Sequence, residues 1–257
     1  MSDKTLIFQK EWGVGMITIN RPAVNNVINM QLAAELADAC AEINRDAEAK
    51  VIIITGAGDN AFSVGVDMNE LSSMVGSKQE MKLLSVAAPV AGLTSPVIAA
   101  INGDALGQGL ELALACDLRI ATETAHFALD HVASGLIPWD GATQRLPRLV
   151  GSAKAIEMLL IGESVDAAEA YRIGLVSKVV PRDQLVPAAM DVAQAMASKA
   201  SLALKYAKEA IRNGFDLTLE QGLRLEADLY SLLQTTEDRT EGIRAFLEKR
   251  PPQFKGK

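Results

Sequence analysis

Two segments of this 257-residue chain combine small residues with the expected start of a helix, and they hold the side chains best suited to chemistry. The first covers residues 61–67 (Ala-Phe-Ser-Val-Gly-Val-Asp) and the second covers residues 101–117. Small residues let a ligand approach the backbone, and the first turn of a helix exposes N–H groups that have no partner inside the helix. Two such helix starts could direct two N–H donors at one oxygen atom, which is what stabilises an oxyanion.

One carboxylate accompanies the second segment. Glu111 follows Gln108 by three residues, so the two residues share one face of the expected helix. A carboxylate in that place projects toward any group that the Gln108 N–H binds. The alternative interpretation is that the neighbouring glycines only allow close helix packing and that Glu111 is a solvated residue of the first turn. The spacing alone leaves both interpretations open.

A glycine-rich turn at residues 56–61 fits the pattern G-x-G-x-x-A of dinucleotide-binding proteins. That mechanism requires the third small residue to enter a helix whose N-terminus meets the pyrophosphate. Gly65 would interrupt such a helix within its first turn. We therefore interpret residues 56–61 as a turn after a buried strand and expect no nicotinamide cofactor.

Few side chains in the sequence suit metal or nucleophilic chemistry. The chain has two histidines, His126 and His131, and two cysteines, Cys40 and Cys116, with no spacing typical of a metal site or a catalytic triad. Both cysteines fall in apolar helical patterns, which indicates unreactive core thiols. We therefore expect no metal site.

The composition argues against several classes of partner. A net charge of −7 is unlike that of a general nucleic-acid surface. No uninterrupted apolar run approaches the ~18 residues that a membrane span needs, and residues 1–4 lack the pattern of a signal peptide. Two unpaired cysteines fit a reducing compartment. We expect a soluble cytoplasmic protein without a nucleic-acid or membrane partner.

The hydrophobic pattern predicts the elements that must position these residues. In the first half of the chain short β-runs alternate with helical segments, and the expected strands cover residues 14–20, 51–55, 96–101, 118–121 and 126–129. The run at 51–55 is continuously apolar, as is typical of a strand covered on both faces. Asn29 is expected to cap a helix whose apolar residues repeat at helical spacing from Leu32 to Ile43.

Helical patterns dominate after about residue 140, with one further β-run at residues 176–180. Asp166 and Glu169 form a variant of the capping box, and Gly174 marks the end of the helix that they begin. Residues 217–233 and 237–250 each show the pattern of a long amphipathic helix. The sequence predicts an α/β core at residues 1–195 and a helical region at residues 196–257.

The two segments, together with residues 135–138 (Gly-Leu-Ile-Pro) and 143–146 (Thr-Gln-Arg-Leu), resemble the crotonase (enoyl-CoA hydratase/isomerase) superfamily. The similarity covers nearly the whole chain, from residues 19–22 (Ile-Asn-Arg-Pro) to residues 245–250. The resemblance implies an α/β fold, a crotonase-like spiral of ββα units that contains an acyl-CoA site, followed by a C-terminal helical trimerisation region. It also implies assembly as a homotrimer or a dimer of trimers.

The implied activity is that of an enoyl-CoA hydratase, a lyase of fatty acid metabolism that adds water to a 2-enoyl-CoA through a thioester enolate. No separate cofactor is expected, because coenzyme A is part of the substrate. The resemblance assigns the two oxyanion-hole amides to Val66 and Gln108 and the water-activating carboxylate to Glu111. The second catalytic glutamate of the hydratases falls on His131. Histidine can protonate the α-carbon near neutral pH, and the alternative is a hydrogen-bonded residue of the pocket wall.

The resemblance also implies residues that bind the acyl group or coenzyme A. They are Asn25, Val27, Ser63, Val64, Gly65, Asp67, Gly107, Trp139, Asp140, Phe246 and Lys249. Asp67 is better explained as a helix cap than as an acid–base group. Asp140 either lies in the site or caps the helix that follows it, and Trp139 either shapes the acyl pocket or packs beneath that helix.

The expected coenzyme A contacts depart from the usual pattern of the family. Many relatives carry a basic pair at the positions of Val24 and Asn25, so the charge contacts of that pair are absent. Phe246 and Lys249 match positions that often reach the coenzyme A of a neighbouring subunit.

Two other functions stay open. The departure at His131 favours another enolate reaction on the same scaffold, such as double-bond isomerisation, β-oxoacyl hydrolysis or decarboxylation. A non-catalytic acyl-CoA binder is the second alternative, and the retention of Glu111 argues against it. Residues 71–90, where a lid over the pocket is expected, follow no recognisable motif. Asp130 lies in an expected extended segment and should point away from the face of His131.

Overall fold

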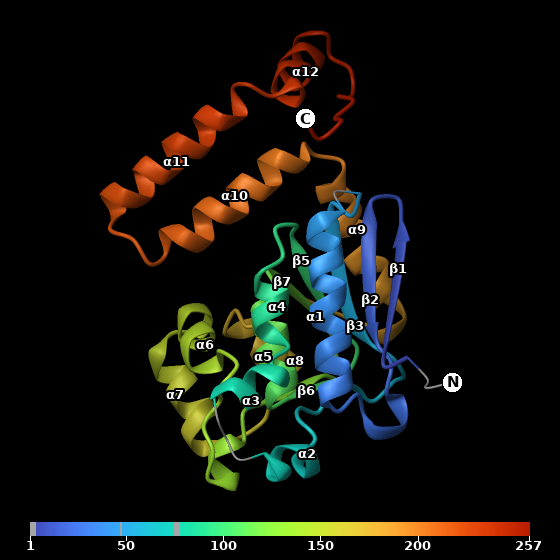
Figure 1. Cartoon of the computed structure of the whole chain (residues 1–257), viewed down its shortest axis with the longest axis vertical. Coiled ribbons are helices and arrows are strands. Elements are labelled where there is room, and N and C mark those ends of the chain that lie inside the picture. The colour runs from blue at the N-terminus through green and yellow to red at the C-terminus, as the bar shows by residue number, and fades with distance from the viewer. Residues whose placement is uncertain (1–3, 47, 75–77) are drawn as a thin grey trace.

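The computed structural model describes residues 4–46, 48–74 and 78–257. The larger of its two sheets has six strands in the order β1-β2-β3-β5-β7-β10. These strands are β1 (Leu6–Glu11), β2 (Val14–Ile19), β3 (Val51–Gly56), β5 (Val97–Ile101), β7 (Leu118–Thr122) and β10 (Lys178–Val180). The β1–β2 pair is antiparallel and the other neighbours are parallel (Figure 1).

Helices cover both faces of this sheet. Those of the core are α1 (Met30–Arg45), α2 (Met68–Ser73), α3 (Lys78–Leu83), α4 (Ala87–Ala91), α5 (Gln108–Ala115), α6 (Ala142–Val150), α7 (Ser152–Ile161), α8 (Ala167–Arg172) and α9 (Leu185–Ala197), with short 3-10 helices η1 (Pro22–Val24), η2 (His131–Ser134) and η3 (Arg182–Gln184). Asn29 caps α1 as predicted, because its Oδ1 accepts the N–H of Leu32 at 2.9 Å. Asp166 caps α8 through the N–H of Glu169 at 2.8 Å.

Burial of β3 on both faces explains its continuous apolar sequence. Ile52 and Ile54 pack in one core cluster with apolar residues of α1, whereas Val51 and Ile53 pack in a second cluster with residues of α9. Successive side chains of a strand point to opposite faces, so a strand between two helical layers needs apolar residues throughout. All six residues of β3 are buried. The strand predicted at residues 51–55 is confirmed.

A second, smaller sheet brings the chemistry-bearing segments together. Its strands are β4 (Ala61–Ser63), β6 (Asp104–Leu106), β8 (His126–Ala128) and β9 (Val165–Asp166), paired in that order. β4, β6 and β8 are parallel neighbours, and they follow β3, β5 and β7 along the chain. The helices α2, α5 and η2 begin soon after these small strands. The expected α/β spiral of repeated ββα units is confirmed, and its helix starts gather at one edge of the small sheet.

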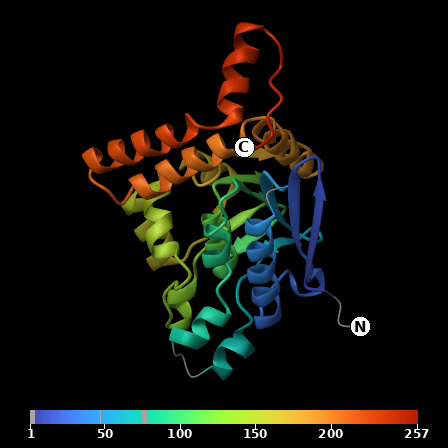
Figure 2. The same ribbon diagram turned by 45° about the horizontal axis from the view of Figure 1, so that its top comes forward.

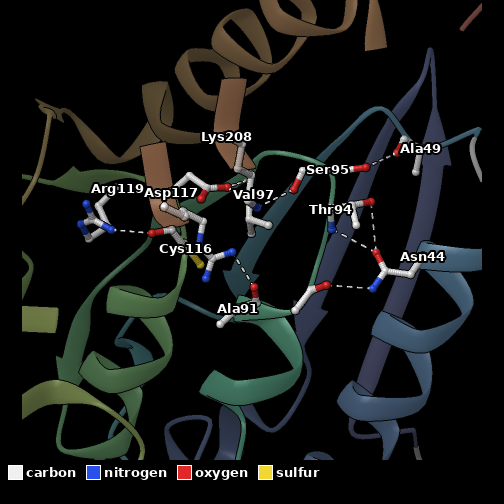
Figure 3. Close-up of polar contacts among 12 residues, drawn as sticks. Asn44, Ala49, Ala91, Thr94, Ser95, Val97, Cys116, Asp117, Arg119 and Lys208 are labelled. Carbon is white, nitrogen blue, oxygen red and sulfur yellow. Dashed lines mark hydrogen bonds and ion pairs between the residues drawn. The ribbon is translucent and has the colours of Figure 1, made fainter. Parts of the chain in front are cut away.

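The C-terminal helices are α10 (Ser201–Gly214), α11 (Leu219–Leu233) and α12 (Glu237–Leu247). α10 and α11 form a hairpin that extends away from the sheets, and α12 lies at the opposite end of the molecule from α2 and α3 (Figures 1 and 2). Lys208 attaches α10 to the core. Its Nζ lies 2.6 Å from Oδ2 of Asp117 and donates to the carbonyl oxygen of Ser95 at 2.8 Å (Figure 3).

The structure differs from the sequence predictions mainly at the ends of elements. β10 begins at Lys178 rather than at residue 176, and α12 ends at Leu247 rather than at residue 250. α3 and α4 occupy much of residues 71–90, where the sequence shows no motif, and residues 75–77 lie outside the described residues. Within the described ranges, no helix has the length and apolar character needed to cross a bilayer.

Candidate active site

The starts of α2 and α5 meet because glycines let the preceding segments touch. β4 and β6 are parallel neighbours, so the chain after β4 runs beside the chain after β6. A Cβ added to Gly65 would lie 3.1 Å from the carbonyl oxygen of Leu106 and 3.2 Å from the nitrogen of Gln108. Gly65 has a φ of +97° and Gly107 a φ of +50°, conformations that L side chains rarely adopt. The glycines are therefore required for this contact.

The N–H groups of Val66 and Gln108 lie at this contact. Val66 forms an isolated bridge with Ile28, but the bonds of the bridge run from the Ile28 N–H to the Gly65 carbonyl oxygen and from the Asp67 N–H to the Ile28 carbonyl oxygen, each at 2.7 Å. Gln108 is the first residue of α5, where an N–H has no partner inside the helix. Neither N–H donates to an acceptor among the residues described.

Glu111 is completely buried in the first turn of α5. Its Oε1 accepts the N–H of Asp140 at 2.9 Å and the N–H of Ala142 at 3.0 Å. Its Oε2 is buried and has no hydrogen-bond partner in the described part of the chain. The solvated interpretation of Glu111 is therefore wrong, because one oxygen is fixed by two amides while the other is left free for a proton.

The surroundings of Glu111 change its acidity. Burial disfavours the charged carboxylate and raises its pKa to about 7, although the N–H of Ala142 opposes this change. The negative charge of Asp140 raises the pKa further. A carboxyl group with a pKa near neutrality can take a proton from water and return it under the same conditions, which suits a general base.

His131 lies beside Glu111 at the start of η2. Its Nε2 is 3.7 Å from Oε2 of Glu111, and its buried Nδ1 has no partner among the residues described. Burial lowers the pKa of His131, and the charge of Asp130 opposes this change. The prediction that Asp130 points away is wrong, because the chain turns here (φ −88°, ψ 16°) instead of extending. A Cβ on Gly107 would lie 3.9 Å from both Oδ1 of Asp130 and Cε1 of His131.

The backbone of Asp140 contacts Glu111, and its side chain binds the start of α4, which lies more than fifty residues earlier in the chain. Its Oδ2 accepts the N–H groups of Val86 at 2.8 Å and Ala87 at 2.9 Å, and its Oδ1 accepts the hydroxyl of Ser85 at 2.6 Å. These bonds satisfy the start of α4. The prediction that Asp140 caps the following helix is wrong, because Gly141 precedes α6 and no side chain caps it.

The side chain of Gln108 turns toward the same segment. Its Nε2 donates to the carbonyl oxygen of Leu84 at 2.6 Å and to Oδ2 of Asp140 at 3.3 Å, and only 1% of the residue is exposed. Its Oε1 is buried without a partner in the described ranges. Gln108 therefore uses its side chain for bonds inside the protein.

Several other predicted residues lie around the meeting point of the two segments. The carboxylate of Asp67 accepts the N–H of Asn69 at 3.0 Å, so its expected role as the cap of α2 is confirmed. The hydroxyl of the buried Ser63 accepts the N–H of Gly65 at 3.3 Å. The N–H of Val64 donates to the carbonyl oxygen of Asn25 at 3.2 Å. These bonds shape the loop before Val66.

Three further predicted residues have less direct relations to Glu111. The carbonyl oxygen of Val27 accepts the guanidinium of Arg21 at 2.6 Å, and Trp139 is partly buried next to Asp140. Phe246 is 82% exposed on α12, far from the start of α5 (Figure 1). Lys249 comes two residues after the end of α12 at Leu247. One chain alone does not bring Phe246 and Lys249 to this site.

His126 and the cysteines lie outside the site. His126 is exposed and its Nδ1 lies 3.1 Å from Oδ1 of Asp104, which fits a surface residue. Burial raises the pKa of both Cys40 and Cys116 to about 12, so these thiols are unreactive. Residues 56–61 connect β3 to β4 and start no helix, which rules out the dinucleotide-binding arrangement. No group of three or more potential metal ligands occurs in the ranges described.

The sequence analysis missed the segment that supports Gln108 and Asp140. Leu84 supplies a carbonyl oxygen, and Ser85, Val86 and Ala87 supply three donors. A serine shortly before an apolar run is a signal for a helix start, and it was the one local clue to α4. The partner that satisfies this start lies more than fifty residues further along the chain.

Known proteins resemble this chain over its whole length. The family model described as "Enoyl-CoA hydratase/isomerase" matches residues 9–257. The chain is 39% identical to a crotonyl-CoA hydratase of Syntrophomonas wolfei over 257 residues, 99% of each protein. It is 41% identical to a 2,3-dehydroadipyl-CoA hydratase of Escherichia coli over 257 residues, 98% of this chain and 99% of that protein.

The solved structures agree. An enoyl-CoA hydratase from Bacillus anthracis superposes with a TM-score of 0.94 at 40% identity and covers 98% of this chain and 100% of that chain. Two sheets joined by ββα units, with helices at the C-terminus, define the crotonase fold. The chain belongs to the enoyl-CoA hydratase/isomerase family.

Proposed function

We propose that this protein hydrates a 2-enoyl-CoA, or catalyses the reverse reaction, through a thioester enolate. The observation that carries the proposal is the state of Glu111. It is buried, one oxygen is held by the N–H groups of Asp140 and Ala142, and the other oxygen has no partner in the described part of the chain. A single carboxylate with one free oxygen beside two unused N–H donors is the arrangement that water addition to an activated thioester needs.

The N–H groups of Val66 and Gln108 would bind the thioester oxygen. Addition of hydroxide to the β-carbon moves negative charge onto that oxygen, so donors directed at it stabilise the transition state more than the ground state. Each donor contributes roughly 3 kcal/mol on the precedent of other oxyanion holes. The contact between Gly65 and the start of α5 supports this role, because it holds both N–H groups in adjoining segments.

Glu111 would orient the water and take its proton. Since the pKa of Glu111 is raised to about 7, the carboxylate is the major form only above that pH. The rate constant kcat/KM should therefore fall on the acid side of about pH 7 as Glu111 is protonated.

His131 would deliver the proton to the α-carbon. Burial disfavours the imidazolium, so His131 is neutral at rest and donates only after it has taken a proton. Glu111, whose Oε2 is 3.7 Å from Nε2 of His131, is the neighbouring group that can supply one. This route moves a proton from water through Glu111 and His131 to the substrate.

Glu111→Gln tests the proposal directly. We expect the hydration of crotonyl-CoA to fall by about 100-fold or more, because a neutral amide cannot act as a base. Binding of the substrate should be unchanged, as measured by calorimetry with the same thioester. Glu123→Gln, which alters an exposed glutamate, is the control and should keep full activity. Near-normal turnover by Glu111→Gln would end the assignment.

The alternative enolate reactions can be tested by comparing substrates. His131 stands where the hydratases carry their second glutamate, and this difference favours isomerisation, β-oxoacyl hydrolysis or decarboxylation as the alternative. Purified protein should be offered crotonyl-CoA, a 3-enoyl-CoA and a malonyl thioester in parallel. A larger kcat/KM for either of the last two would replace hydration with the corresponding reaction, and binding without turnover of any would indicate an acyl-CoA-binding protein.

We further propose that residues 196–257 form an oligomerisation region and that the protein is a homotrimer or a dimer of trimers. The exposed apolar side chains of Leu219, Phe246 and Leu247 support this, with exposures of 80%, 82% and 74%. In such an assembly Phe246 and Lys249 would reach the coenzyme A of a neighbouring subunit. Light scattering on the eluted protein tests the assembly, and a monomer would contradict it. The buried, unpaired cysteines support a place in the reducing cytoplasm.

A further inference from the structure

Every polar group of Asp140 has a partner. Its N–H donates to Glu111 at 2.9 Å, and its carbonyl oxygen accepts the guanidinium of Arg145 at 2.8 Å. Its two carboxylate oxygens accept the donors of residues 85–87 and the amide of Gln108. Only 7% of the residue is exposed. An acidic residue this buried persists when its bonds compensate for the lost hydration.

We infer that Asp140 is a positioning residue, which holds the carboxylate of Glu111 through its own N–H while its side chain ties that loop to the start of α4. The inference rests on the proposed function in one respect, which is that Glu111 is the general base. Asp140 itself has no free group to offer a substrate. It acts on the reaction through Glu111.

The loop is fixed from two sides. The carboxylate of Asp140 binds residues 85–87 on one side, and the guanidinium of Arg145 binds the carbonyl oxygen of Asp140 on the other. Arg145 also packs directly on Gly141, where an added Cβ would overlap Nη1 of the guanidinium. The N–H groups of Asp140 and Ala142 are therefore held in a fixed direction toward Glu111, which a loop without these anchors could not do.

The same anchor reaches the second donor of the proposed oxyanion hole. The side chain of Gln108 donates to Oδ2 of Asp140 at 3.3 Å, while the main-chain N–H of Gln108 is the proposed donor to the thioester oxygen. One carboxylate thus supports both the base and the start of the helix that presents the donor. Displacement of Asp140 should disturb the two together.

The pKa of Glu111 distinguishes a positioning role of Asp140 from a role in stability alone. The charged or titratable groups that face Glu111 are His131 at 3.7 Å, Asp140 and Arg145. Burial lowers the pKa of Arg145, and the charges of Asp140 and Glu111 oppose this change. The charge of Asp140 raises the pKa of Glu111. Asp140→Asn keeps the size of the side chain, and with its oxygen in the place of Oδ2 it still accepts the N–H groups of Val86 and Ala87. Its amide then lies in the place of Oδ1 and can donate to the hydroxyl oxygen of Ser85. The substitution removes the charge, so the pKa of Glu111 should fall.

The experiment is a carbon-13 NMR titration of the Glu111 carboxyl in the wild type, Asp140→Asn and Asp166→Asn. Asp166 caps α8 as Asp140 caps α4, so its variant is matched in charge and in capping. We expect the Glu111 titration to move to lower pH in Asp140→Asn alone, and the acid side of the kcat/KM profile to move with it. An unchanged Glu111 titration in a folded Asp140→Asn would overturn the inference.

A second variant covers the case in which Asp140→Asn does not fold. Ser85→Ala removes one donor to the Asp140 carboxylate and leaves its charge less compensated, so the Glu111 titration should move slightly to higher pH. A shift to lower pH, or none, would contradict the inference. The NMR titration needs no substrate. If Glu111 titrates as expected while no variant, nor the wild type, hydrates crotonyl-CoA, the positioning role stands and the proposed function fails.

Discussion

Oε2 of Glu111 lies 3.7 Å from Nε2 of His131, and both side chains are buried. The distance is too long for a hydrogen bond and short enough for one water or one substrate hydroxyl to lie against both groups. Burial raises the pKa of Glu111 and lowers the pKa of His131, so each change favours the uncharged form. Transfer of a proton from Glu111 to His131 creates two buried charges, so the imidazolium forms only transiently on the way to the α-carbon.

The burial of Glu111 should lower the stability of the fold at neutral pH. Its pKa is raised from 4.5 to about 7, so the native state prefers the protonated form. The contribution of protonated Glu111 to the unfolding free energy is fully present below the pKa of this side chain in the unfolded chain. It is lost as the pH rises through about 7. We expect Glu111→Gln to be more stable than the wild type at about pH 8 by about 3 kcal/mol. The two proteins should differ little at about pH 4, where both carry a neutral side chain.

Urea unfolding at both pH values measures this difference. Glutamine can keep the bonds from Asp140 and Ala142 through its Oε1, so the comparison isolates the charge. Glu123→Gln serves as the control for removal of an exposed charge. A variant that is less stable than the wild type at the higher pH would show that Glu111 is not strained by burial.

His131→Gln should lower hydration without removing the base. The amide cannot pass a proton to the α-carbon, so we expect kcat to fall by about 100-fold while KM changes little. Exchange of the α-hydrogen of butyryl-CoA with deuterium oxide should fall with it, because exchange uses the same protonation step. Full exchange in His131→Gln would show that another group protonates the α-carbon.

Gly65→Ala tests the contact that holds the two N–H donors. An added Cβ would lie 3.1 Å from the carbonyl oxygen of Leu106 and 3.2 Å from the nitrogen of Gln108, both of which are backbone atoms. The segments must then separate, so we expect kcat to fall by about 100-fold, the effect of losing one oxyanion donor. Gly151→Ala is the matched control, because Gly151 has a φ of +82° but no atom within 4 Å of the added Cβ.

Both variants carry the backbone strain of a non-glycine residue at positive φ, about 1 kcal/mol. Thermal melting should show this strain in both proteins, with a further loss in Gly65→Ala from the contact with Leu106 and Gln108. Only Gly65→Ala should lose activity. Equal activity of the two variants would mean that the spacing between Val66 and Gln108 does not matter for catalysis.

Local signals in the sequence were sufficient to predict the helices whose first turns form the candidate site. Asn29 precedes a helix with regular apolar spacing, and the starts of α2 and α5 are marked by small residues before helical patterns. The strands β4 and β6 were not predicted, because three residues are too few to show an alternating pattern. What places Val66 beside Gln108 is the pairing of these two short strands, which only the fold supplies.

The role of Asp140 could not be predicted because its partners are remote in the chain. Ser85 and Ala87 are 55 and 53 residues away, and the sequence between them and Asp140 holds two strands of each sheet. A local interpretation could only offer the following helix, which starts without a side-chain cap. The predicted orientation of Asp130 was wrong for another reason. A turn of 3-10 helix begins after Asp130 in place of the expected extended chain.

The ion pair between Lys208 and Asp117 should decide how firmly the C-terminal helices are attached. Nζ of Lys208 is nearly buried and its pKa is lowered by that burial, while Asp117 opposes the change. Asp117→Asn leaves the ammonium with the carbonyl oxygen of Ser95 and no opposing charge, so we expect a loss of about 3 kcal/mol of unfolding free energy. Lys208→Met should cost less, because it removes the buried charge and keeps an apolar stem.

Asp117 keeps one partner in Lys208→Met, since its carboxylate also accepts the N–H of Val97 at 2.8 Å. The double variant should therefore lie close to Lys208→Met, because the Asp117 carboxylate left in that variant is partly exposed to water and keeps its bond from Val97. Urea unfolding of the three variants gives the coupling. Hydrogen exchange in α10 should rise most in Asp117→Asn, and a larger rise in Lys208→Met would show that the lysine, rather than its unpaired charge, holds α10 to the core.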